Sequence, residues 1–463
     1  MSLLIFCFYL SFNFSFAQAS ESSFTKEQIQ EDLAFLKLNL EKYHPNLYLY
    51  SDKKSLDGYF ENLGNYVVDP INSAESFKLI SSTSAVIMDG HYTLSPDATT
   101  LSNFYTNSML LPLDIFWVEM DAYLIRNFTD SQELKIGERI FSINGVPIEN
   151  IQKVILTNVL RDGNNKTYPM WILNNFLRAY YGFYFGSPED YVIEIGPEAN
   201  NTQMIQIKGL SHSEIKQAKK NKYPAYDKIE ETKQGLSLSM DPKLKLARLT
   251  IRSFDKKILK NEYQQKFKPV LRGFMQEIND ADIEHLVIDI RDNQGGEVSN
   301  GIFLLKHLLD QPFTAVIRHA KVDKNNYNNL SERTKKANSS VDGIQKPFTK
   351  NNYRKQLYLL TNGGSFSCSG IFAQALKSQN RGTFIGQETG GSAYNLVGLP
   401  TKDITLPHTK IMVNIPRVQF VLQEITPKKG SGVIPDIRTE ISIENILENR
   451  DIEYQEVLDL IKK

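Results

Sequence analysis

The spacing of apolar residues predicts several helices in the first half of the chain. In residues 24–43 apolar side chains recur about every 3.6 positions, the period of an amphipathic helix. This helix should end at His44, because a residue that precedes a proline avoids helical backbone. A second helix is expected over residues 73–88, and the densely aromatic segment 168–186 predicts a third.

From about residue 108 the pattern changes to short strands. Residues 137–148 indicate a strand, an Asn-Gly turn and a second strand, which is the sequence pattern of a hairpin. Residues 191–195 and 204–210 are expected to close this sheet. Residues 211–243 are polar and rich in lysine, so they are interpreted as a linker or surface insertion.

The last part of the chain alternates strands with helices. The continuous apolar runs at 286–290 and 356–360 are typical of buried parallel strands. Helices are expected at 261–279 and 300–309 and directly after the second run. This order predicts an α/β layer from about residue 245 onward.

Composition excludes some classes of protein. Lys+Arg and Asp+Glu both number 53, so the formal charge is zero, without the basic excess of a nucleic-acid-binding protein. Two cysteines in 463 residues exclude a disulfide scaffold and a zinc site made of four thiolates. We expect no nucleic-acid partner.

The N-terminal residues predict export. Residues 2–16 are apolar and uncharged and are followed by Ala17-Gln18-Ala19, as in a signal peptide cleaved near these alanines. The predicted location is therefore periplasmic or extracellular. No later stretch reaches the roughly 18 apolar residues of a membrane span, so stable membrane insertion is not expected.

Two glycine-containing loops that follow the buried strands could carry chemistry. Residues 289–296 end in Gly295-Gly296, where backbone N–H groups can closely approach a ligand, as an oxyanion hole requires. The alternative is a turn that needs glycines for its geometry alone. The second loop, residues 361–370, leads into a helix whose N-terminus would favour a serine nucleophile. Cys368 is the rival nucleophile, unless it is a buried and inert thiol.

A serine nucleophile needs a base, and the chain contains seven histidines. His91 lies on a tight Asp89-Gly90 turn outside any apolar face, which distinguishes it from the histidines within apolar runs. From this local context His91 is a candidate base.

These segments resemble the signature blocks of the C-terminal (tail-specific) processing peptidases and the related tricorn core protease. The blocks occur in the family's order over about residues 25–445. They are GERIFSING (137–145), DIRDNQGG (289–296), SFSCSGIFAQAL (365–376), GQETGG (386–391) and GSGVIPD (430–436).

The resemblance implies roles for individual residues. The nucleophile would be Ser367, and the oxyanion hole would use backbone N–H groups of Gly295, Gly296 and Cys368. The lysine that activates the serine in one branch of the family is absent, because the GQETGG block is followed by Ser392. The resemblance therefore implies the tricorn-like branch, in which a histidine before the PDZ segment is the base.

His91 occupies that histidine position, and its carboxylate partner would be Glu424, with Asp89 as the local alternative. Two residues depart from the pattern. Gly90 replaces the serine before the histidine, and Gly370 replaces the glutamate of the nucleophile block.

The fold that the resemblance implies is a mixed α/β one, with a ClpP/crotonase-like α/β core and an inserted PDZ-like β domain. The expected divisions are 1–19 signal peptide, 20–105 N-terminal helical region, 106–210 PDZ-like domain, 211–243 linker and 244–463 catalytic core.

The implied activity is that of a serine endopeptidase acting on unfolded or C-terminal peptide segments, without a metal ion or cofactor. The edge strand of the PDZ-like domain would pair with the extended peptide. Two alternatives stay open. One is a catalytically defective protein of the same fold that binds a peptide or lipophilic ligand, and the other is an esterase or amidase for small substrates.

Overall fold

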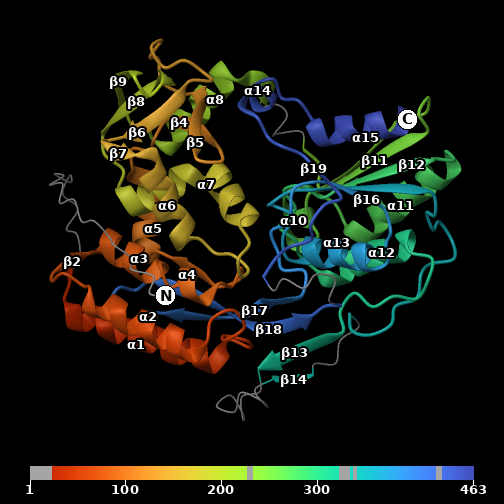
Figure 1. Ribbon diagram of the computed structural model, residues 1–463, viewed down its shortest axis with the longest axis horizontal. Helices are drawn as coiled ribbons and strands as arrows, with labels where there is room; N and C mark the ends of the chain where they lie inside the picture. The colour runs from red at the N-terminus through yellow and green to blue at the C-terminus, as the bar shows by residue number, and fades with distance from the viewer. Residues whose placement is uncertain (1–22, 227–232, 323–333, 337–340, 424–429, 463) are drawn as a thin grey trace.

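The computed structural model describes residues 23–226, 233–322, 334–336, 341–423 and 430–462. It is a mixed α/β protein, as the sequence predicts (Figure 1). Within the described residues, no helix has the length and apolarity needed to cross a membrane.

The N-terminal region is helical. Its first helix begins after Thr25, whose side chain caps the backbone of Gln28, and ends at the residue before His44, as the sequence predicts. The helix expected over residues 73–88 is instead two helices, because the backbone turns at Ser82 and Thr83. The elements are β1 (Ser23–Phe24), α1 (Lys26–Tyr43), α2 (Lys53–Asn65), β2 (Ile71–Asn72), α3 (Ser73–Ser81), α4 (Ser84–Ile87), β3 (Thr93–Ser95) and α5 (Ala98–Asn107).

An antiparallel sheet in the order β4-β5-β6-β8-β9 follows, with β7 paired to β6. Its buried residues belong to the same hydrophobic core as those of α1–α4, so the boundary expected at residue 105 runs through one continuous core. The elements are β4 (Leu113–Val118), β5 (Asp121–Asn127), β6 (Arg139–Ile143), β7 (Val146–Pro147), α6 (Ile148–Asn158), α7 (Thr167–Phe185), β8 (Asp190–Glu198) and β9 (Asn201–Lys208).

The segment 211–243 is more ordered than a linker. Ser211 and Glu214 form a capping box that begins helix α8 (His212–Lys222), of which only Ile215 is buried. Because this helix lies almost entirely in solvent, its polar composition resembles that of a loop. Strand β10 (Leu236–Asp241) then pairs with the first strand of the next sheet.

The C-terminal part contains a six-stranded sheet in the order β10-β11-β12-β15-β16-β19, parallel from β11 onward, which confirms the predicted α/β layer. Helices α11–α13 share one core with this sheet. The elements are β11 (Leu246–Ile251), α10 (Lys256–Asn261), α11 (Phe267–Asp280), β12 (His285–Asp289), α12 (Val298–Leu308), β15 (Gln356–Thr361), α13 (Cys368–Ser378), β16 (Thr383–Gly386), β19 (Ile437–Arg438), α14 (Ile443–Leu447) and α15 (Ile452–Lys462).

A further sheet joins the two halves of the molecule. Its long strands β17 (Asn395–Thr405) and β18 (Met412–Val421) pair with each other, and β18 also pairs with β13 (Arg318–Val322), which in turn pairs with β14 (Thr334–Lys336). Strand β3 of the N-terminal region adds to β18. A segment near residue 93 is thereby fixed to the C-terminal part of the chain.

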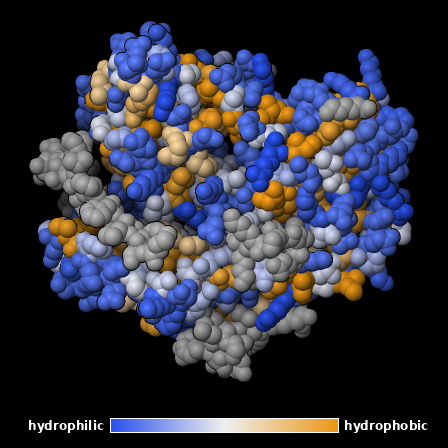
Figure 2. Space-filling model, in the orientation of Figure 1, coloured by the Kyte–Doolittle hydropathy of each residue, from blue (hydrophilic) through white to orange (hydrophobic). Residues whose placement is uncertain are grey.

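Polar and apolar residues are unevenly distributed on the surface. Hydrophilic residues cover most of the outer parts of the face in Figure 2, whereas hydrophobic residues gather toward its middle, between the lobe of β4–β9 and the lobe of the parallel sheet.

Candidate active site

Two loops meet at the carboxyl ends of neighbouring parallel strands. Asp289, the last residue of β12, lies beside Leu360 of β15. The loops that follow are bonded to each other, because Ser365 Oγ donates to Ile290 O at 2.8 Å and Phe366 N to Asn293 O at 3.0 Å. In parallel α/β sheets ligands bind at this edge.

Ser367 is the N-cap of α13, with φ +55° and ψ −118°. This left-handed conformation is strained for a residue with a side chain, and such strain is typical of a nucleophile on a sharp strand-to-helix turn. The helix that starts here adds the positive end of its dipole.

His91 reaches Ser367 although 276 residues separate them. The turn that carries His91 follows α4 and leads into β3, which is held on β18 by strand pairing and by the bond from Thr93 Oγ1 to Asn414 Oδ1 at 2.8 Å. His91 Nε2 lies 3.0 Å from Ser367 Oγ. The structure therefore joins the predicted nucleophile and the predicted base by a hydrogen bond, within the range that proton transfer requires.

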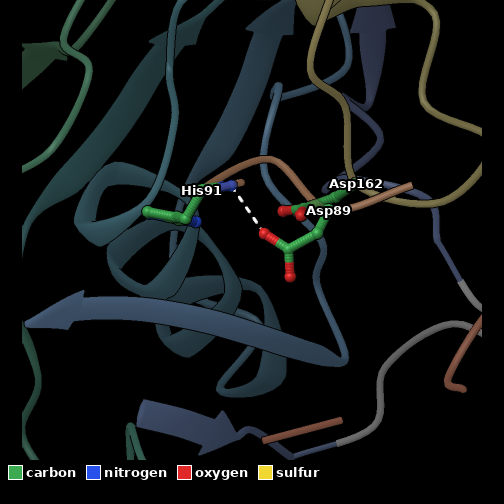
Figure 3. A group of neighbouring side chains, drawn as sticks. All are labelled: Asp89, His91 and Asp162. Atoms are coloured by element: carbon green, nitrogen blue, oxygen red, sulfur yellow. Dashed lines mark hydrogen bonds between the residues drawn. The ribbon is translucent and has the colours of Figure 1, made fainter. Parts of the chain in front are cut away.

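Asp89 holds the backbone of the His91 turn. Its Oδ1 accepts the N–H group of His91 at 2.6 Å (Figure 3) and that of Tyr92 at 3.1 Å. Its Oδ2 lies 2.9 Å from His44 Nε2, to which it is hydrogen-bonded. Burial alone would raise the pKa of Asp89, but the His44 hydrogen bond and charge keep it below its usual value. Asp89 thus binds the main chain of His91, and no bond joins it to the ring.

The imidazole of His91 is desolvated. Its ring packs against Phe366, with ring centres 4.8 Å apart, and Nδ1 is buried without a hydrogen-bond partner among the described residues. Burial lowers the pKa of His91 below its usual value, and the negative charge of Asp89 opposes this only in part. The ring is therefore neutral at pH 7, as a general base must be. Glu424, the predicted carboxylate partner, lies outside the described residues.

The predicted oxyanion donors differ in availability. Gly295 already donates its N–H to Asn293 Oδ1 at 2.9 Å. Gly296 and Cys368 have no acceptor for their backbone N–H groups among the described residues. A Cβ on Gly295 would lie 2.8 Å from Ser367 Cβ, so only glycine permits this close approach to the nucleophile.

The rival nucleophile is unsuited to the role. Cys368 is buried, its Sγ donates to Glu297 O at 3.4 Å, and burial raises its pKa to about 12. A thiol with this pKa remains protonated near neutrality and is inert.

Residues 245–439 match the model of Peptidase family S41. The matched region is that of a serine-type peptidase and contains Gly295, Gly296 and Ser367.

Solved structures share the fold of nearly the whole chain. The crystal structure of mature CPAF matches with 15% identity and a TM-score of 0.64, over 94% of this chain and 98% of that one. Mature CPAF complexed with lactacystin matches with 17% identity and a TM-score of 0.64, over 95% and 98%. The photosystem II D1 C-terminal processing protease matches with 15% identity and a TM-score of 0.42, over 91% and 96%. At these identities the CPAF similarity concerns the fold.

One departure from the peptidase pattern has a steric reason. A Cβ on Gly90 would lie 2.6 Å from Phe366 Cζ and 2.9 Å from Asp162 Oδ1, so this position has no space for the serine of the tricorn-like pattern. At the other departure, Gly370, a Cβ would make ordinary contacts of 3.7 Å with Gly391. We find no structural reason for the missing glutamate there.

Four residues support this site although no sequence pattern predicted a role in it for them. His44 holds Asp89, Asn293 holds Gly295, Phe366 packs on His91, and Asp162 accepts the Gly90 N–H. For Asn293, the position between a buried strand and two glycines was a usable signal. Asp162 lies in an ordinary polar loop, where no local pattern indicates its role.

A metal ion would have to compete for the acidic part of this peptidase site. Ligand atoms of Asp89, His91 and Asp162 lie within 4.8 Å of one another. However, the oxygens of both aspartates already accept hydrogen bonds, and His91 Nε2 is bonded to Ser367. A metal ion would have to displace these hydrogen bonds, which instead suit a site for proton transfer between Ser367 and His91.

Proposed function

We propose that the chain is an exported serine endopeptidase that cleaves unfolded or C-terminal peptide segments through an acyl-enzyme on Ser367. The observation that carries this proposal is the 3.0 Å contact between His91 Nε2 and the hydroxyl of a serine in a strained helix-cap conformation.

The chemistry follows from that contact. His91 Nε2 takes the proton of Ser367 as Oγ attacks the peptide carbonyl carbon. The resulting oxyanion accepts the N–H groups of Gly296 and Cys368, each worth about 3 kcal/mol in comparable enzymes. His91 then donates its proton to the leaving amine, and water hydrolyses the ester to release the acyl product and restore Ser367.

Peptide selection by a sheet edge requires a free strand, and β4 is not free. Asn174 of α7 bonds both the N–H and the C=O of Trp117, at 2.8 and 3.2 Å, and Arg178 of α7 donates to Leu111 O and Leu113 O. Strand β9 is at the opposite edge, and a hollow of about 520 Å³ lies between it and α8. In our proposal an extended tail would add to β9.

The Ser367→Ala variant tests the function. An enzyme should lose nearly all hydrolysis of unfolded casein and all labelling by a fluorophosphonate, while its thermal unfolding stays unchanged. Turnover that persists in Ser367→Ala would refute Ser367 as the nucleophile. Preferential hydrolysis of a small ester over casein would instead support the esterase alternative, and peptide affinity without turnover in the unmutated protein would support the binding alternative.

Export has its own test, because the apolar segment 2–16 lies outside the described residues. We expect the full chain to be found in the periplasm or medium, shortened near Ala17–Ala19. A chain that begins at Ser20 should stay in the cytoplasm. Retention of both forms inside the cell would contradict the proposal.

A further inference from the structure

Asp162 is a buried carboxyl group to which the mechanism above assigns no role. It lies between α6 and α7 and is 2% exposed. Its Oδ1 accepts the N–H of Gly90 at 2.8 Å, and its Oδ2 accepts the N–H of Ser392 at 2.9 Å. A single side chain therefore connects two turns from opposite halves of the molecule.

Each of these turns is adjacent to one member of the proposed catalytic pair. Gly90 precedes His91 in the chain. Gly391 precedes Ser392, and a Cβ on Gly391 would lie 3.1 Å from the backbone nitrogen of Ser367. Asp162 thus bridges the turn that carries the base and a turn that packs against the nucleophile.

The surroundings of Asp162 make its charge sensitive to pH near neutrality. Burial and the nearby negative charge of Asp89 raise the pKa of Asp162 to about 7, although its two backbone hydrogen bonds oppose this. Figure 3 shows the two aspartates side by side, with the His91 ring pointing away from Asp89. The other ionisable groups here are His44, which is bonded to Asp89, and the phenols of Tyr50 and Tyr168.

The protonation state of Asp162 decides how many N–H groups it can accept. An ionised carboxylate accepts both, one on each oxygen. A protonated carboxyl presents an O–H donor on one oxygen, which then faces an N–H donor, so one of the two links weakens.

We propose that Asp162 is a positioning residue that aligns His91 with Ser367, and that the alignment is complete only while both of its oxygens accept backbone N–H groups. This inference rests on the proposed peptidase function. Asp162 touches no reacting atom and acts through the two turns.

The test compares Asp162→Asn with the unmutated enzyme. The amide keeps the size of the side chain but offers one acceptor oxygen, so it imitates the protonated form at every pH. We expect kcat to fall on the order of 10- to 100-fold at about pH 8.5, with KM changed less than about threefold, because small displacements of catalytic groups cost this much.

The pH profile separates positioning from a purely structural role. As pH rises through about 7, ionisation of Asp162 should raise kcat of the unmutated enzyme. Asp162→Asn should lack this inflection, so that the difference between the two activities narrows progressively as pH falls below about 7.

Asp32→Asn is the matched control. Asp32 is also fully buried, and its carboxylate accepts the N–H groups of His408 and Thr409 at 2.8 Å each, away from the catalytic pair. It should lose stability but keep the kcat and the pH profile of the unmutated enzyme.

Three results would overturn the proposal: equal kcat in Asp162→Asn and Asp32→Asn, an inflection near pH 7 that persists in Asp162→Asn, or no such inflection in the unmutated enzyme. The last result needs no variant, so it applies even if Asp162→Asn fails to fold. If the unmutated protein has no activity that Ser367→Ala abolishes, the proposed function itself has failed.

Discussion

Replacing Gly90 with alanine should disable the enzyme through a single methyl group. The added Cβ would lie 2.6 and 2.7 Å from Phe366 Cζ and Cε2, whereas carbon atoms in contact are about 3.5–4.0 Å apart. The Phe366 ring would have to retreat by about 1 Å. It is buried between Tyr168, stacked at 4.2 Å, and His91, centred 4.8 Å away, so it cannot move alone.

The expected cost of Gly90→Ala follows from this packing. Overfilling a packed core destabilises a protein by about 1–3 kcal/mol. Because the displaced ring touches His91 and belongs to the residue before Ser367, we also expect kcat/KM on unfolded casein to fall on the order of 100-fold.

Gly58→Ala is the control for Gly90→Ala. Gly58 lies in α2 with no atom within 4 Å of the added Cβ, so this variant should keep full activity and gain up to about 1 kcal/mol of helix stability. Denaturant unfolding and steady-state kinetics of both variants provide the comparison. A Gly90→Ala enzyme as stable and as active as the Gly58→Ala enzyme would refute the reasoning.

Three further predictions concern ionisation. Burial lowers the pKa of His91, so the activity that remains below the Asp162 inflection should fall about tenfold per pH unit only where His91 becomes protonated, at a pH below the ordinary histidine value of about 6.5. A flat kcat/KM profile down to about pH 4 would contradict His91 as the base. Burial raises the pKa of Cys368 to about 12, so the thiol stays protonated at neutral pH and should not react with iodoacetamide. Turnover should therefore be unchanged by this reagent. Inhibition that follows alkylation of Cys368 would contradict its burial. Burial alone would raise the pKa of Asp289, but Arg291 and Arg248 hold it at about 2. The ion pairs of Asp289 therefore stabilise the folded protein by roughly 2 kcal/mol above the unfolded-state pKa, which is near 4. This stability should be lost as pH falls from about 4 to 2. Acid unfolding of Arg291→Lys should begin at a higher pH than that of the unmutated protein, and coincident curves would contradict the assigned pairing.

The strands β12 and β15 and the loops that follow them were predicted well, because each is marked by a pattern of neighbouring residues in the sequence. Continuous apolar runs identified β12 and β15, and glycines after each strand identified the loops that carry Gly295 and Ser367. The local Asp89-Gly90 turn made His91 a candidate among the seven histidines, and the resemblance to tail-specific peptidases then selected it. The contact with Ser367 depends on the pairing of β3 with β18, which is a tertiary event.

Other features could not be predicted from the sequence, because they too depend on contacts between residues far apart in the chain. Asp162 acquires its role from backbone groups 72 and 230 residues away. The occupation of the β4 edge by α7 depends on where Asn174 and Arg178 point after folding. Helix α8, by contrast, has a local signal in the sequence, the Ser211–Glu214 capping box. The polar composition of the segment nevertheless led to the prediction of a linker.

The pairing of β3 with β18 also has a consequence for biosynthesis. Thr93 of β3 is translated 321 residues before Asn414, its partner on β18 (Met412–Val421). The turn that carries His91 therefore cannot take its folded position until β18 has been synthesised.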